Sequence, residues 1–264
     1  MSTREVEKYS VPGLERGLRI LCEFSRETPT LTAPILAKRL NVPRTTVFRL
    51  LVTLEGLGFV ERARNGRDYQ LGTAVLKLGF EYLASLSLTE LSRPILESLR
   101  DDLGYSANLV IRDGRDIVYV QKVASNSLFT SAVHIGTRLP AHATVLGRVL
   151  LCNHSFQELQ DLYPEEHLQS HGPQTPPTVK DLYKLLHTDK ERGYVLEEGF
   201  FERNISTIAA PVYNEDGDVQ AALGLTIPHV HIPPGDRDKL ILKVRTAAGD
   251  LSACLNHSAQ TRVS

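Results

Sequence analysis

This sequence of 264 residues has few cysteines, no long apolar run and no recognisable secretion signal. Its three cysteines, Cys22, Cys152 and Cys254, lie far apart without CxxC spacing, so neither a disulfide framework nor a zinc cluster is indicated. Nowhere do about 18 apolar residues follow one another, and the N-terminus MSTREVEKYS has no apolar segment. These absences predict a protein of the reducing cytoplasm, without a membrane span.

Sequence patterns of the common catalytic sites are missing as well. The chain has no phosphate-binding glycine loop, no HExxH and no GxSxG. His229 and His231 would share one face of a strand, but a zinc site needs a third ligand nearby. Cys152 and His154 sit two residues apart and would point apart in a helix, which argues against a nucleophile–base pair. We therefore expect no catalytic residue, no metal and no cofactor.

Charge is balanced over the whole chain but not along it. Residues 1–72 hold twelve Lys and Arg against eight Asp and Glu, which leaves eighteen against twenty-three beyond. Between Lys38 and Arg67 there are seven basic residues and only two acids. A positive segment suits a polyanion such as DNA, although a solvated basic face is the simpler alternative. The length allows two domains with cores of their own.

Two helices are predicted at the front of the chain. Leu14, Leu18 and Leu21 recur at helical spacing and predict a packed helix, with Phe24 extending the apolar stripe. Thr32 is a good N-cap for a second, short helix. Its buried face would hold Ile35, Leu36 and Leu40. Asn41 tolerates a left-handed backbone, so a tight turn to the next helix is expected there.

The third helix is predicted over about residues 43–57, with apolar residues at i, i+3, i+4, i+7 and i+10. These residues are Val47, Leu50, Leu51, Leu54 and Leu57. The opposite face carries an aromatic residue, Phe48, together with Thr45, Arg49, Val52 and Thr53.

A hairpin is predicted directly after this helix. FVER and RDYQL flank Ala63-Arg64-Asn65-Gly66, and Asn-Gly is a strong signal for a two-residue turn. Two helices, a short turn, a third helix and a basic hairpin are together typical of a winged helix-turn-helix, over residues 10–72.

In a winged helix-turn-helix the exposed face of the third helix enters the major groove of DNA. Phe48 would contact thymine methyl groups there, while Arg49 reaches a guanine edge or a phosphate. The alternative is that Phe48 and Val52 pack on a neighbouring element of the protein. The residues that we predict to contact double-stranded DNA are Arg44, Thr45, Thr46, Phe48, Arg49, Arg62, Arg64 and Arg67.

Residues 73–88 are predicted to form a connector helix that is apolar beyond one stripe. Leu76, Phe80 and Leu83 stand at i, i+4 and i+7. A lone connector would be more polar, so we expect this helix to pack against its counterpart in a second subunit; burial against the protein's own domains is the alternative. A homodimer with two recognition helices would bind an inverted-repeat operator.

The remainder, residues 89–264, alternates strand and helix periods and predicts a mainly antiparallel α/β sandwich. The overall class is therefore α+β. Strands are expected as a pair over 106–123 around Asp113-Gly114, singly over 129–135, and as a second pair over 205–228. Helices are expected over 89–104, 143–151, 155–163, 178–193 and 233–255.

Several segments resemble the IclR family of transcriptional regulators, in the family's order, over about residues 10–257. They are GLERGLRIL, LAKRLNVPRTTVFRLLVTLEGLGFVER, the connector helix, IGTRLPAHATVLGRVLL, ERGYVLEEG and the strand pair ending in LGLTIP. The resemblance implies an N-terminal DNA-binding domain, a C-terminal effector-binding domain over residues 89–257 that takes a small organic effector, and dimers that pair into tetramers.

The resemblance also implies where the effector binds. Relatives that bind two-carbon acids are similar but carry small or hydroxyl residues where Leu146 and Gly224 stand, so a larger, partly apolar acid fits this pattern as well. His142 lies beside the implied pocket, where it would bond the effector or anchor its loop. The implied effector-binding residues are His142, Thr144, Leu146, Gly147, Thr207, Gly224 and Thr226.

The sequence therefore predicts a DNA-binding transcriptional regulator that responds to a small organic acid. An enzyme that transforms its ligand, with the basic front end as an accessory DNA-binding module, is the alternative from another class. A redox or metal sensor is a third, which the cysteine spacing does not favour. The ligand's fate separates the first two, because a regulator leaves its effector chemically unchanged.

Overall fold

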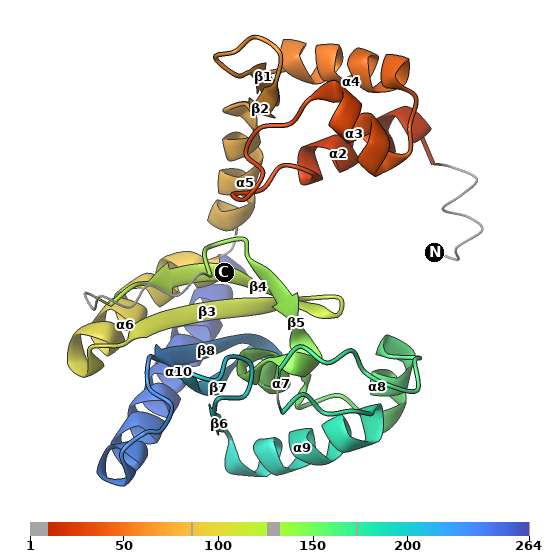
Figure 1. Cartoon of the computed structure of the whole chain (residues 1–264). Helices are drawn as coiled ribbons and strands as arrows, with labels where there is room; N and C mark the ends of the chain where they lie inside the picture. The colour runs from red at the N-terminus through yellow and green to blue at the C-terminus, as the bar shows by residue number, and fades with distance from the viewer. Residues whose placement is uncertain (1–9, 86, 126–132, 173, 264) are drawn as a thin grey trace. The chain divides into compact units, whose positions relative to one another are not determined.

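The computed structural model describes residues 10–85, 87–125, 133–172 and 174–263 (Figure 1). The chain divides into two compact units, residues 1–85 and 86–264. The helix predicted over 73–88 is α5 (Ala74–Ser85), which belongs to the first unit, and a new helix starts at Ser87.

The described part of the first unit is a small domain of four helices and a hairpin. Its core is formed by side chains that are fully or almost fully buried, from the first three helices, the segment between the first two and the hairpin. The elements are α2 (Pro12–Cys22), α3 (Ala33–Leu40), α4 (Arg44–Gly56), β1 (Val60–Arg62), β2 (Tyr69–Leu71) and α5. The core residues are Ile20, Phe24, Leu31, Leu36, Ala37, Val47, Leu51, Val60 and Tyr69.

The turn between α3 and α4 forms as the sequence predicts. The Thr32 side chain accepts a hydrogen bond from the Ile35 backbone N–H and so caps α3. Asn41 ends the helix in the left-handed region, at φ 51° and ψ 49°. Its N–H and that of Val42 both point back to the last turn of α3, which keeps the connection to α4 short.

The buried face of α2 differs from the predicted one. Leu14 and Leu18 are 63% and 54% exposed, whereas Gly17 and Ile20 are buried and Phe24 follows in the core. The predicted stripe is wrong for this helix because the core is reached by the neighbouring stripe, at spacings of three and four residues. Ile35 on α3 is likewise exposed, although it was predicted to be buried.

The hairpin exists, but its turn is longer than the Asn-Gly pattern predicts. Arg62 pairs with Tyr69, which leaves residues 63–68 as the loop. Gly66 has a positive φ of 68° and Asn65 does not, so the two residues do not form the predicted two-residue turn. Hydrogen bonds from Ala63 N–H to Asp68 O and from Gly66 N–H to Ala63 O close the loop instead.

The second unit is built on a six-stranded, fully antiparallel sheet with the strand order β5-β4-β3-β8-β7-β6. The strands are β3 (Ser106–Asp113), β4 (Asp116–Val123), β5 (Arg138–Pro140), β6 (Val195–Glu198), β7 (Ser206–Tyr213) and β8 (Val219–Ile227). This confirms the predicted antiparallel α+β class.

Helices cover both faces of this sheet (Figure 1). On one face α7 packs on β7 and β8, with α9 outside it; on the other, α6 and α10 pack together. Local capping bounds α8 and α9, through a Ser155–Glu158 capping box at the start of α8 and through Thr178 and Gly193 at the two ends of α9. The helices are α6 (Ser87–Leu103), the 3₁₀ turn η1 (Ala141–Ala143), α7 (Val145–Leu151), α8 (Phe156–Leu162), α9 (Val179–Arg192) and α10 (Pro234–Val263).

Three details of the sheet differ from the prediction. The strand expected over 129–135 falls partly outside the described residues, and its described part, 133–135, is not a strand; the edge strand is β5. Strand β6 was not predicted, because VLEE shows neither alternation nor a long apolar run. The loop between β3 and β4 is Gly114-Arg115, one residue later than predicted, since Asp113 pairs with Asp116.

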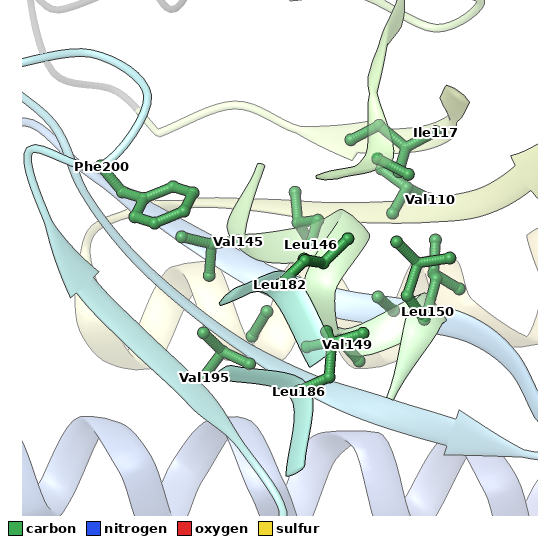
Figure 2. Close-up of a cluster of buried hydrophobic side chains, with 14 of the residues drawn as sticks. Val110, Ile117, Val145, Leu146, Val149, Leu150, Leu182, Leu186, Val195 and Phe200 are labelled. Carbon is green, nitrogen blue, oxygen red and sulfur yellow. The ribbon is translucent and has the colours of Figure 1, made fainter. Parts of the chain in front are cut away.

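The core of the second unit lies between the sheet and α7 (Figure 2). Every residue of α7 is buried, so this short helix is enclosed by the sheet, η1 and α9. A helix enclosed in this way holds any ligand site that borders it in a fixed geometry. The labelled side chains are Val110, Ile117, Val145, Leu146, Val149, Leu150, Leu182, Leu186, Val195 and Phe200.

Candidate functional site

The outer face of α4 is apolar at its centre and open to solvent. Phe48 is 52% exposed and Val52 is 48% exposed, while Val47 and Leu51 on the opposite face are fully buried. The alternative that Phe48 and Val52 pack on a neighbouring element therefore fails within the first unit. Thr45 and Arg49 are exposed beside Phe48, as the sequence predicts. This surface offers both methyl-contacting and hydrogen-bonding groups to a major groove.

Four of the predicted arginines keep their charge available. In the described part of the chain, no ion pair or side-chain hydrogen bond holds Arg44, Arg49, Arg64 or Arg67, and all four are exposed. Uncompensated guanidinium groups on one small domain produce the positive field that DNA phosphates require. Thr46, the remaining predicted contact on α4, is half-buried and lines the same hollow as Phe48 and Arg49.

Arg62 differs from the other wing arginines because its side chain is already engaged. Its Nε lies 3.2 Å from Glu55 Oε1, and its Nη1 donates to Gly66 O at 3.1 Å. The guanidinium also lies over the ring of Tyr69, 4.9 Å from the ring centroid. These contacts fix the hairpin against α4, so Arg62 supports the wing in this structure. Sequence reasoning missed this role, because the partner Glu55 is seven residues away on another element.

Asn65, which the sequence marks as a turn residue, organises the longer loop of the wing through its side chain. Its Oδ1 accepts hydrogen bonds from the backbone N–H groups of Arg67 and Asp68, each at 3.0 Å. Its Nδ2 donates to Asp68 Oδ2 at 2.8 Å. Asn65 thereby shapes the loop that carries Arg64 and Arg67 at its ends.

The second unit contains a cavity of about 50 Å³ at the start of α7, bordered by β4, β7, β8 and the loop after β6. Four of the predicted effector residues meet there: Thr144, Leu146, Thr207 and Thr226. The structure thus brings together residues that lie up to 82 positions apart in the sequence (144 to 226). The other lining residues are Tyr119, Val133, Leu139, Val145, Phe200, Phe201, Glu202 and Ile205.

Gly147 and Gly224 do not line the cavity, and both serve close packing. A Cβ at Gly147 would lie 2.1 Å from Ala141 O, so this glycine lets η1 close against α7. A Cβ at Gly224 would lie 2.8 Å from both Ile208 O and Leu146 Cδ2. Leu146 therefore fills the space that a side chain at position 224 would occupy, and the two departures from the two-carbon-acid pattern are coupled.

Thr144 lines the cavity, but its hydroxyl is committed to the backbone. It accepts from Gly147 N–H at 3.1 Å, as the N-cap of α7, and donates to Pro140 O at 3.3 Å. With its hydrogen and one lone pair used, Thr144 is a poorer ligand group than predicted. Thr207 and Thr226 are not used in this way: they are paired neighbours on β7 and β8 that carry their hydroxyls on the same face of the sheet.

His142 anchors a loop and does not reach the cavity. Its Nε2 lies 2.9 Å from Gln169 O, and its ring meets those of Tyr163 and His171 edge to face. Burial lowers the pKa of His142, with the hydrogen bond to Gln169 opposing that shift. Of the two roles that the sequence left open for His142, the contacts are those of a loop anchor.

Tyr119 and Glu202 are lining residues that sequence reasoning missed. Tyr119 is almost fully buried on β4, and its pKa is raised by burial and by the nearby Glu202 carboxylate. Its phenol is therefore a neutral hydrogen-bond donor at the cavity wall. A cation lies close by as well, since the Nζ of Lys122 donates to the carbonyl of the lining residue Val133 at 2.6 Å. No local pattern marks these residues, which come from a strand and an irregular loop.

A buried cluster of charged residues around Arg148 supports the cavity lining at Phe200. Arg148 on α7 makes two 2.8 Å hydrogen bonds to the Asp189 carboxylate and one of 2.7 Å to Glu197 on β6. Its guanidinium also lies 5.0 Å from the ring centroid of Phe200, which lines the cavity. The cluster joins α7, α9 and β6 and orients Phe200.

The remaining polar candidates give no catalytic or metal-binding arrangement. Within the described ranges, no three His, Cys, Asp or Glu side chains are grouped as metal ligands require. Burial raises the pKa of Cys152 to about 11, so its thiol is not an activated nucleophile. His231 is exposed and bonded to Glu198 at 2.8 Å.

No helix among the described residues is long and apolar enough to cross a membrane.

Comparisons with known proteins agree with this two-part architecture. Residues 13–64 match the IclR helix-turn-helix domain, and residues 80–253 match the bacterial transcriptional regulator IclR C-terminal domain. The chain is 29% identical over 236 residues to the Pca regulon regulatory protein of Pseudomonas putida, covering 89% of this chain and 80% of that protein.

Two solved structures extend the comparison. A transcriptional regulator of Rhodococcus sp. RHA1 is 32% identical, with a TM-score of 0.82, over 93% of this chain and 98% of that one. An IclR homolog of Microbacterium hydrocarbonoxydans, complexed with 4-hydroxybenzoate, shares the fold at 23% identity, with a TM-score of 0.81, over 92% and 98% of the two chains. The chain belongs to the IclR family of bacterial transcriptional regulators, with an N-terminal helix-turn-helix DNA-binding domain and a C-terminal ligand-binding domain.

Proposed function

We propose that this regulator reads an inverted-repeat operator as a homodimer and that a small organic acid, bound in the cavity beside α7, changes its affinity for DNA. The observation that carries the proposal is the pairing of two surfaces. One is an exposed α4 face with arginines that have no side-chain partner among the described residues, and the other is a cavity whose lining includes four hydroxyl-bearing residues. It would act in the cytoplasm, where the operator is.

On the DNA side, Arg49 is the base-reading residue and Arg64 and Arg67 hold phosphates. Arg49 lies beside Phe48 on the exposed face of α4, whereas the wing arginines flank the hairpin loop. Phosphate contacts position a protein on DNA without reading sequence, and base-edge contacts specify it. Arg49→Ala should therefore relax sequence preference, and Arg64→Ala should weaken specific and random duplexes alike.

The dimer is proposed to form through α5. Leu76 and Leu78 on this helix are 58% and 59% exposed, an unusual share of apolar surface for a helix that stays in water. The side chains of Phe80 and Leu83, which complete the predicted stripe, lie outside the described residues. Sedimentation of a Leu76→Glu, Phe80→Glu variant tests the interface, because these positions are four residues apart on the predicted stripe and charge buried there should split the dimer. A variant that sediments like wild type would show that the subunits join elsewhere. Pairing of two such dimers into a tetramer is the further state that this experiment would detect.

On the effector side, Thr207, Thr226 and Tyr119 offer hydroxyl groups to a carboxylate, and Leu146 and Phe200 cover an apolar body. The homolog complexed with 4-hydroxybenzoate shows that this fold accommodates an aromatic acid. A cavity of about 50 Å³ is a few times what one water needs, so an acid of a few heavy atoms fits directly. A ring requires Leu146 or Phe200 to move.

A thermal-shift screen of the full chain against carboxylic acids, from acetate to 4-hydroxybenzoate, tests this site. A bound acid should stabilise the protein by about 2.7 kcal/mol at a hundredfold excess over Kd. Thr226→Val should fold and lose the shift, while Ser155→Ala, a cap on the distant α8, should lower the melting temperature but keep the shift. Chromatography of the acid after incubation should show it unchanged, since the cavity has no paired nucleophile and base among its lining residues. Consumption of the acid would favour the enzyme alternative.

A further inference from the structure

The cavity borders a buried polar pair that the proposed function does not use. Asn108 lies in the middle of β3, with its Cα paired to Gly224 on β8 and to Lys122 on β4, and only 1% of it is exposed. Its Nδ2 donates a hydrogen bond of 2.9 Å to Thr226 Oγ1. Thr226 lines the cavity and Asn108 does not, although its strand β3 lies between the lining strands β4 and β8. The contact through which Asn108 can influence a ligand is its hydrogen bond to Thr226.

The hydrogen bond decides what Thr226 can offer. A threonine hydroxyl has one hydrogen and two lone pairs, and here one lone pair is taken by Asn108. No described group accepts the hydroxyl hydrogen of Thr226. Its paired neighbour Thr207 makes no side-chain hydrogen bond within the described residues either. The hydrogen of Thr226 is thus left to point into the cavity.

The orientation of the Asn108 amide supports this assignment. Asn108 Oδ1 is buried and has no hydrogen-bond partner among the described residues. If the amide were turned over, Thr226 would donate to Oδ1 and the buried NH₂ would lose its acceptor. An unpaired buried N–H is rarer in proteins than an under-satisfied carbonyl, so the orientation with Asn108 as donor is the favoured one.

We infer that Asn108 is a positioning residue that sets the specificity of the cavity: it fixes Thr226 as a hydrogen-bond donor, so the effector group held there is an acceptor such as a carboxylate oxygen. A hydroxyl group in that place could also accept the Thr226 hydrogen, but a neutral hydroxyl is a weaker acceptor than a carboxylate. The inference rests on the proposed effector site and names the chemical group that the site selects.

The test compares each acid with the alcohol that has CH₂OH in place of its carboxylate. Suitable pairs are propionate with propan-1-ol and 4-hydroxybenzoate with 4-hydroxybenzyl alcohol, titrated calorimetrically into the full chain. Wild type should prefer the acid by at least about tenfold, as expected for a hydrogen bond to a charged group. Asn108→Asp cannot donate and turns the Thr226 hydrogen towards itself, so the preference should fall by about tenfold or more.

Asn108→Leu removes the amide at similar volume and keeps the test valid if the aspartate variant does not fold. It frees the hydroxyl to rotate, and the acid preference should again fall. Ser206→Ala is the matched control, because Ser206 is fully buried next to Thr207 but bonds the carbonyls of His229 and Val230. It should lower the melting temperature and leave the acid-to-alcohol ratio unchanged.

The outcomes separate this inference from the proposed function. If acids bind and the ratio is unchanged in a folded Asn108 variant, Asn108 does not set specificity. If wild type prefers the alcohols, the cavity selects donors and the inference is wrong, although the effector site stands. If no acid binds to wild type, the proposed organic-acid effector fails, and the inference fails with it.

Discussion

The two units handle their functional groups in opposite ways. The DNA-binding unit places them on its surface: Phe48 and Arg49 project from α4, and no residue that the structure describes forms an ion pair with Arg49. The ligand-binding unit encloses them, so that Thr226, Tyr119 and Leu146 are each less than a tenth exposed. A surface that binds a large polyanion needs only exposed side chains and positive charge. A cavity that selects a small molecule needs rigid walls, and α7 with the Arg148 cluster provides them.

The largest effect should come from breaking the cluster behind the cavity. Arg148→Met removes a guanidinium that is 2% exposed and leaves the Asp189 carboxylate buried without its partner. The free energy of unfolding should drop by about 3–5 kcal/mol. Arg138→Met is the control, because Arg138 pairs with Asp113 and Asp116 at the surface and should cost about 0–1 kcal/mol. Chemical denaturation measures the free energy of unfolding of both variants. Equal losses of stability would show that the Arg148 cluster contributes no more than a surface ion pair.

Closing of η1 against α7 should be the next most sensitive feature. Gly147→Ala pushes a Cβ into the Ala141 backbone and should destabilise the unit by about 1–3 kcal/mol or more. Gly249→Ala, in the middle of α10, meets nothing within 4 Å and should stabilise by about 0.5–1 kcal/mol. Opposite shifts in melting temperature are expected. A neutral Gly147→Ala would mean that the loop has room that the structure does not show.

On the DNA side, Arg49 and Arg62 are expected to affect different properties of DNA binding. Arg49→Ala should cost about 1–3 kcal/mol of discrimination between operator and random duplex. Arg62 is held by Glu55 and Gly66, so Arg62→Ala should change the salt dependence of binding less than Arg64→Ala does. Fluorescence anisotropy across a salt series measures both quantities. Unchanged discrimination in Arg49→Ala would remove its base-reading role.

The smallest effect is a pH dependence from the loop anchor. Burial lowers the folded pKa of His142 below its unfolded value, so the unfolded chain takes up the proton first as the pH falls. The stability that neutral His142 contributes is complete above about pH 6.5 and is lost as the pH falls through the folded pKa. His142→Asn keeps a donor for Gln169 O and cannot titrate there. Denaturation of both proteins between about pH 8 and pH 5 should show a steeper loss for wild type, and parallel curves would contradict this.

The same contrast explains what could be predicted from the sequence. Periodicity found the outer face of α4, because Val47 and Leu51 mark the hidden side and leave Phe48 on the other. Local chemistry found Thr32 and Asn41, each of which acts within a few residues of itself. Features that depend on residues close together in the sequence can therefore be predicted from the sequence.

The cavity could be predicted only in part, because its properties depend on pairs from different strands. The family resemblance implied Thr207 and Thr226, but not that Asn108, 118 residues away, donates to Thr226. Gly147 and Gly224 were expected to bind the effector and turned out to permit close packing, which only the distances to Ala141 and Leu146 show. The predicted stripe on α2 failed because two apolar stripes compete there and only tertiary contacts choose between them.

One titration tests the central claim that the enclosed cavity controls the exposed DNA-binding face. The affinity of the full chain for its operator is measured with and without a saturating acid identified in the thermal-shift screen, for wild type and for Thr207→Val. The acid should change the operator affinity of wild type by about 5–150-fold and leave that of Thr207→Val unchanged, with both proteins binding DNA equally well in its absence. An acid response retained in a folded Thr207→Val protein would contradict the account and place the effector elsewhere.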